Sequence, residues 1–112
     1  MVERSNMGRQ WTSNPMNFRS PKLLKSAQGQ RCLYCDRYSD TVVSCHSNRA
    51  AQGKWLSIKA HDFYVAWLCG DCHNLYDGRT GRLTREEQDE LWTRAYLRTV
   101  EQWFLQGIVV VK

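Results

Sequence analysis

Apolar residues recur at helical spacing over residues 91–104 and stop before Gly107. Thr84 and Glu87 precede this run with the spacing of a capping box, in which each side chain bonds the backbone of the other residue. The pattern predicts a long amphipathic C-terminal helix that begins after Thr84 and packs its apolar side on the core. Residues 108–111 are β-branched and are expected to add a short strand.

Two earlier stretches have the composition of strands. Residues 41–45 are largely β-branched and apolar, and residues 63–68 are aromatic and apolar throughout. The polar loop between them, residues 47–59, contains a glycine, so we expect a hairpin. A short helix is predicted at residues 22–28, and another should follow the second strand with Asp71 as its N-cap. This order predicts a small α+β fold.

Residues 1–21 contain both prolines and only scattered apolar side chains, so we expect a flexible basic N-terminal arm before a single domain at residues 22–112. The chain has 16 Lys and Arg residues against 11 Asp and Glu, a formal charge of +5. Such a surface attracts polyanions, first of all nucleic acid. No stretch reaches the about 18 apolar residues of a membrane span, and no apolar secretory segment begins the chain, so we expect a cytoplasmic protein without membrane contact.

Four of the five cysteines form two Cys-x-x-Cys pairs, Cys32 with Cys35 and Cys69 with Cys72. In a reducing compartment, cysteines at this spacing are typical of a metal site rather than of disulfides. A two-residue spacer lets both thiolates of a pair face one ion, so the four predict a structural Zn²⁺ site. Cys45 is left over.

Polar residues that are suited to catalysis follow the predicted elements closely. His46 comes at the end of the first strand, directly after Cys45. His73 and Asp77 are four residues apart on the predicted short helix, which places them on one face about one turn apart. Because a histidine and a carboxylate follow the last cysteine so closely, we expect a second site beside the four-cysteine site, with a function beyond stabilising the fold.

These motifs together resemble the HNH, or ββα-metal, endonucleases, and most closely the small nucleases of lambdoid phages and prophages. The resemblance covers residues 22–77 and extends to the C-terminal helix. It implies a zinc-stabilised, treble-clef-like ββα-metal core with a long C-terminal helix, so that residues 22–112 form one HNH-like nuclease domain. It also implies that His46 is the general base and that His73 and Asp77 hold a catalytic divalent cation, Mg²⁺ or another.

Hydrolysis of a phosphodiester needs a base for the attacking water and positive charge near the phosphate, and a histidine and a bound cation can supply them. The implied reaction cuts DNA to 5′-phosphate and 3′-hydroxyl ends, in phage DNA recombination or processing within a bacterial host cell. Basic residues near the predicted site are candidates to contact the DNA: Arg49, Lys54, Lys59, Arg79 and Arg82. Arg49 and Lys54 are the first candidates to hold a phosphate and Arg79 and Arg82 are weaker ones, and for these four a solvated charge is at least as good an explanation.

This chain departs from the family pattern in two places. Many of these nucleases have a metal-binding Asp or His just before the general base, where this chain has Cys45. Cys45 is therefore a further candidate metal ligand that would favour a softer ion, but we prefer a neutral buried thiol. The central Asn has no clear counterpart; Asp62 lies nearest and is expected to pin the loop. His61 is either another ligand or base, or a solvated loop residue.

Two other functions fit part of the sequence. A non-catalytic zinc-ribbon module that binds nucleic acid explains the cysteines and the charge but gives His46, His73 and Asp77 no joint role. A zinc-stabilised adaptor would use the aromatic C-terminal helix to bind a protein partner. The same helix suits a homodimer and a monomer equally well.

Overall fold

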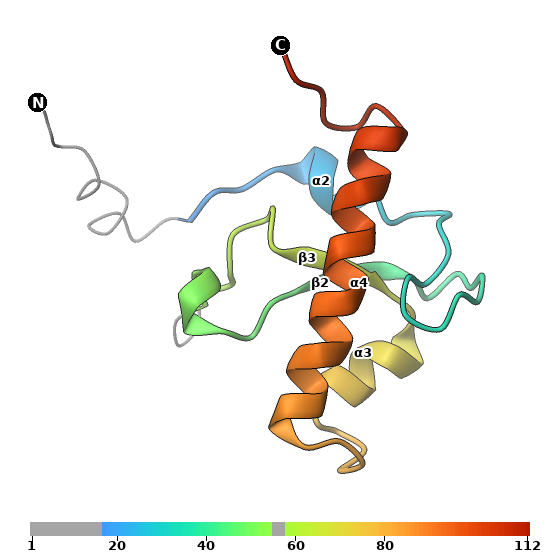
Figure 1. The fold of residues 1–112 in the computed structure, drawn as a ribbon, viewed down its shortest axis with the longest axis vertical. Helices are drawn as coiled ribbons and strands as arrows, with labels where there is room; N and C mark the ends of the chain where they lie inside the picture. Colours follow the sequence, from blue (N-terminus) through green and yellow to red (C-terminus); the bar gives the residue numbers. More distant parts are fainter. Residues whose placement is uncertain (1–16, 55–57) are drawn as a thin grey trace, which may run out of the picture.

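A two-stranded antiparallel hairpin lies at the centre of the fold, and a long helix crosses it (Figure 1). The computed structural model describes residues 17–54 and 58–112. Strand β2 (Val43–His46) pairs with β3 (Val65–Leu68), and His46 lies opposite Val65. The predicted α+β fold with a central hairpin is confirmed, and each strand starts two residues later than the sequence pattern suggests.

The long helix α4 (Arg85–Leu105) begins with the predicted capping box. Thr84 Oγ1 accepts a hydrogen bond from the Glu87 backbone N–H at 3.1 Å, and Glu87 Oε1 accepts one from the Thr84 N–H at 2.8 Å. These two bonds satisfy backbone donors that would otherwise lack a partner at the helix start. The helix then runs for 21 residues along the hairpin, which makes it the largest scaffold element in the described part of the chain.

Three tryptophans connect α4 and the hairpin to the rest of the core. The indole N–H of Trp92 donates to the carbonyl of Cys45 in β2 at 2.9 Å. The indole N–H groups of Trp67 and Trp103 both donate to Ser26 Oγ, at 3.1 and 2.9 Å. All three rings are buried, and each polar edge has a partner, so their role is in packing; for Trp92 and Trp103 the helical spacing predicts this.

The short helix after β3 is α3 (Gly70–Tyr76), and its start differs from the prediction. Asp71 is not the N-cap. Cys69 occupies that position without a side-chain capping bond, and the exposed N–H of Gly70 donates instead to Thr41 Oγ1 at 3.0 Å. The cap comes from a residue distant in sequence, which a local pattern cannot reveal.

The remaining elements are short. Helix α2 (Pro21–Lys25) begins at the N-cap Ser20 and packs against β2, and the loop after β2 contains one 3₁₀ turn, Ala50–Gln52. The strand predicted at residues 108–111 is wrong: the backbone N–H groups at 108 and 109 both bond the carbonyl of Trp103 and close the end of α4. Among the described residues, no helix is long and apolar enough to cross a membrane.

Candidate active site

The four paired cysteines meet at one point beside the N-terminus of α3. The Sγ atoms of Cys32, Cys35, Cys69 and Cys72 all lie within 4.8 Å of one another, and none of these cysteines forms a disulfide. A tetrahedral zinc with Zn–S bonds of about 2.3 Å would place its sulfur ligands about 3.8 Å apart. The Cys35 and Cys69 sulfurs are 3.8 Å apart, so the cluster fits a structural zinc.

His46 and Cys45 point to opposite sides of β2, because successive side chains alternate along a strand. Cys45 lies in the core with 1% of its surface exposed. Burial, with the negative charge of Asp77 adding to it, raises the pKa of the Cys45 thiol. The geometry therefore favours the neutral-thiol interpretation of Cys45, and it places His46 on the open side of the strand together with Ser44.

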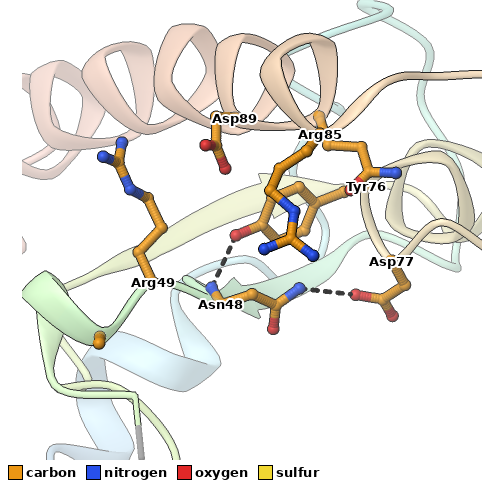
Figure 2. Close-up of a pocket in the computed structure, with 8 residues that line it drawn as sticks. Asn48, Arg49, Tyr76, Asp77, Arg85 and Asp89 are labelled. Carbon is orange, nitrogen blue, oxygen red and sulfur yellow. Dashed lines mark hydrogen bonds between the residues drawn. The ribbon is translucent and has the colours of Figure 1, made fainter.

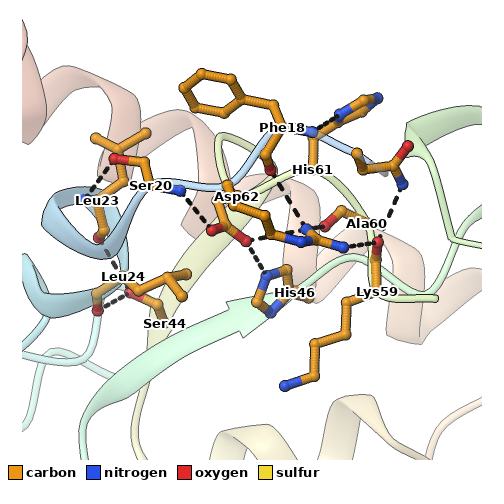
Figure 3. A network of polar contacts seen from close by, with 12 residues as sticks. Phe18, Ser20, Leu23, Leu24, Ser44, His46, Lys59, Ala60, His61 and Asp62 are labelled. Carbon is orange, nitrogen blue, oxygen red and sulfur yellow. Dashed lines mark hydrogen bonds and ion pairs between the residues drawn. The ribbon is translucent and has the colours of Figure 1, made fainter. Parts of the chain in front are cut away.

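A buried carboxylate orients the His46 ring. Asp62 is 2% exposed, and its Oδ1 lies 2.8 Å from Nε2 of His46 (Figure 3). The other oxygen accepts the backbone N–H of Ser20 at 2.7 Å, and Arg19 donates to Oδ1 at 3.1 Å. Burial alone disfavours the charged form, but the bonds from His46 and Ser20 and the charge of Arg19 outweigh it and lower the pKa of Asp62.

The charge state of Asp62 decides how the His46 ring bonds to it. An ionised carboxylate only accepts hydrogen bonds, so the Nε2–H of His46 donates to Asp62, and Nδ1 is the ring nitrogen turned away from it. Among residues 17–54 and 58–112, no group forms a hydrogen bond or ion pair with Nδ1 of His46. Nδ1 is therefore the ring nitrogen that is left for water or a substrate.

The segment just before α2 holds the loop that carries Asp62. Arg19 also donates to the carbonyls of Ala60 at 2.6 Å and Lys59 at 2.8 Å, and the Phe18 N–H donates to Nδ1 of His61 at 3.0 Å (Figure 3). The sequence pattern assigns residues 17–20 to a flexible arm, but here they support the site; the rest of that arm lies outside the described residues. His61 serves as an acceptor in this contact and does not line the cleft described next.

His46 shares a cleft of about 280 Å³ with His73 and Asp77, which α3 presents from the other side. Nε2 of His73 lies 3.3 Å from Oδ2 of Asp77, and Asn48 Nδ2 donates to the other oxygen of Asp77 at 3.3 Å. Neighbouring ligands of an octahedral cation with bonds of about 2.1 Å are about 3 Å apart. The separation of His73 and Asp77 is compatible with two neighbouring positions around such a cation, and it equally fits a direct contact between the imidazole and the carboxylate.

The predicted basic residues do not all lie in this cleft. Lys54 and Lys59 line it, whereas Arg49 lines a second cleft alongside. Arg79 Nε is 4.0 Å from Oδ2 of Asp77, and Arg82 lines neither cleft.

Sequence reasoning missed three supporting residues. Tyr76 OH accepts the Asn48 backbone N–H at 2.6 Å, which joins the loop after His46 to α3. Burial raises the pKa of Tyr76 to about 12, so the hydroxyl stays neutral. Asn48 follows His46 closely enough to have been suspected, but no local signal connects Tyr76 or Arg19 to the site.

A model of the family described as "Putative nuclease YbcO" matches residues 21–108. Among solved structures, one described as "a putative bacteriophage protein from Escherichia coli str. K-12 substr. MG1655" has a similar fold, with a TM-score of 0.58. The two chains are 23% identical, and the match covers 76% of this chain and 99% of the other, so the likeness shows the fold alone. No curated protein matches the chain.

Proposed function

Because this chain belongs to the YbcO family of putative nucleases, we propose that it is a metal-dependent DNA endonuclease of the HNH type. Membership of the family implies a nucleic-acid substrate, and the site supports the finer assignment. The observation that carries it is one cleft that brings His46 together with the His73 and Asp77 pair. A zinc ribbon that only binds nucleic acid has no need of this arrangement.

His46 is the general base in this proposal. Its Nδ1 takes a proton from a water molecule, whose oxygen attacks phosphorus while the bond to the 3′ oxygen breaks, and the departing 3′ oxygen takes up a proton from solvent water. The products are a 5′-phosphate and a 3′-hydroxyl end. Asp62 holds the ring and stabilises the imidazolium that forms, through the bond of 2.8 Å to Nε2.

His73 and Asp77 would hold the divalent cation, Mg²⁺ or another, which when bound supplies Lewis-acid stabilisation of the phosphate charge. Asn48 fixes the Asp77 carboxylate so that its second oxygen faces His73. Lys54 and Lys59 line the same cleft and add positive charge where the substrate phosphate would lie.

The four-cysteine cluster has a structural role in this scheme. It joins residues 32–35 to the start of α3 and thereby sets the position of the helix that carries His73 and Asp77. We propose that the protein acts on DNA during phage recombination or processing in the bacterial cytoplasm, a setting consistent with the phage origin of the similar structure.

The decisive experiment incubates supercoiled plasmid with the full chain and Mg²⁺, Mn²⁺ or Ni²⁺. We expect nicked and linear products whose ends a ligase can rejoin, because ligation requires a 5′-phosphate and a 3′-hydroxyl. His46→Ala should lower the cutting rate by about 10²- to 10⁴-fold, the contribution of a general base, and should retain zinc and DNA binding.

His61→Gln is the matched control, because His61 lies in the same region but does not line the cleft. It should cut like the wild type. DNA binding without any cutting by the wild type would instead support the zinc-ribbon alternative. Equal loss of cutting in both variants would also contradict the assignment of His46.

A further inference from the structure

A second, larger cleft adjoins the one that contains His46. It has a volume of about 620 Å³ and lies between the loop after β2, the end of α3 and the first turns of α4 (Figure 2). Asn48 and Asp77 line both clefts. A strand with one phosphate in the first cleft would therefore continue directly into the second.

Two arginines face this second cleft from different elements. Arg49 comes from the loop after β2, and Arg85 comes from the first turn of α4 (Figure 2). Within residues 17–54 and 58–112, neither guanidinium has a hydrogen-bond or ion-pair partner. Guanidinium groups stay charged at any physiological pH and present a planar fork of donors that matches a phosphate.

The cleft also contains negative charge, from Asp77 and from Asp89. Asp89 lies one turn along α4 from Arg85 and faces the same space, and no ion pair joins it to either arginine among the described residues. Its charge opposes the binding of an anion. The two arginines must therefore act together to favour a phosphate there, and Asp89 offers a variant with an effect of opposite sign.

We propose that Arg49 and Arg85 form a phosphate subsite that binds the DNA backbone next to the scissile phosphate. The position relative to the scissile bond rests on the proposed nuclease function, whereas the phosphate contact itself does not. Arg85 has no special sequence signal, because an arginine in the first turn of a helix is indistinguishable from an ordinary solvated charge. Only the fold places it on the same cleft as Arg49.

The test measures duplex oligonucleotide binding by the full chain as a function of salt, in a His46→Ala background that does not cut. Each lost phosphate contact lowers the slope of log K against log salt by about 0.9. Arg85→Gln should show this change. The loss of affinity relative to the parent should then be about eightfold greater at 0.1 M salt than at 1 M salt. Asp89→Asn should strengthen binding.

Arg94→Gln is the matched control, because it removes the same charge from the same helix. Nine residues are two and a half helical turns, so Arg94 lies on the opposite side of α4, where its guanidinium stacks over Tyr34 at 5.7 Å. It should leave the slope unchanged. An equal change for Arg85 and Arg94, or no change for either, would overturn the proposal.

A cutting assay separates this proposal from the proposed function. Bis(4-nitrophenyl) phosphate is small enough to occupy the first cleft alone, so Arg85→Gln should hydrolyse it at the wild-type rate. On an oligonucleotide the same variant should raise KM and keep kcat. If the wild type hydrolyses neither substrate, the nuclease assignment fails and the salt slope still decides the subsite. Absence of DNA binding by the parent chain overturns both.

Discussion

Asp62→Asn is the substitution that tests the site most directly, because it keeps the shape of a buried side chain and removes its charge. The carboxylate accepts three hydrogen bonds, from His46, Ser20 and Arg19. An amide has one oxygen and one donor group in place of two acceptors. If the amide oxygen faces His46, the NH₂ group faces the Ser20 N–H, and two donors oppose each other. If the oxygen faces Ser20, the NH₂ group faces Nε2 of His46.

Either arrangement has a cost in stability. Loss of one member of a buried ion pair costs about 3–5 kcal/mol. Arg19 is partly exposed, so its ion pair with Asp62 contributes less than a fully buried one would. We therefore expect the free energy of unfolding to fall by about 3 kcal/mol. In the second arrangement Nε2 must accept, so the proton moves to Nδ1 and the base is lost, and kcat should fall by about 10²- to 10⁴-fold.

Urea unfolding and plasmid cutting measure the two effects, with Asp36→Asn as the control. Asp36 forms an exposed pair with Arg98 at 2.8 Å, and its left-handed backbone, with φ of 66°, suits asparagine. Loss of this surface pair should cost less than about 1 kcal/mol. A similar small cost for Asp62→Asn, or unchanged kcat, would refute the argument that Asp62 orients His46.

The pH dependence gives an independent check of the same reasoning. The pKa of Asp62 is lower in the folded state than the ordinary value of about 3.9. The carboxylate therefore contributes stability above that ordinary value, and the contribution is lost as the pH falls through the folded-state pKa. The difference in stability between the wild type and Asp62→Asn should be full near neutral pH and shrink below about pH 4. A difference that does not change with pH would contradict the assignment.

Three further predictions concern the scaffold. Metal analysis should find one zinc per chain, and a strong chelator should lower the unfolding temperature because the cluster joins residues 32–35 to α3; an unchanged temperature would argue against a structural zinc. Cys45→Ala should keep zinc and cutting activity, since the thiol lies in the core; loss of either would make it a ligand. Thr84→Ala should cost about 1 kcal/mol in urea unfolding and leave cutting intact, and no cost would contradict the role of the capping box.

Much of the site could be predicted because its signals are local. The spacing of Cys32, Cys35, Cys69 and Cys72 is enough to indicate a metal cluster, and the four-residue interval from His73 to Asp77 places both on one helix face. The capping box that begins α4 likewise needs only two residues, which are three positions apart in the sequence. Each of these signals is local, within one helix turn or within one of the two Cys-x-x-Cys pairs.

Other contacts depend on residues that are far apart in the chain. Asp62 meets His46 across 16 residues and Arg19 across 43, so no periodicity or motif connects them. The cap of α3 by Thr41 and the convergence of Arg49 with Arg85 arise in the same way.

Short-range spacing was therefore sufficient for the long helix and for the His73 and Asp77 pair, because each follows from the pitch of one element. The hairpin and the cysteine cluster were predicted from repeated local patterns, two strand-like runs and two Cys-x-x-Cys pairs, which the fold then brings together. The packing of the loop around Asp62 against residues 17–20 set the orientation of the His46 ring and gave a role to a segment whose sequence resembles a flexible tail. Those features depend on how separate elements meet, which only the folded chain specifies.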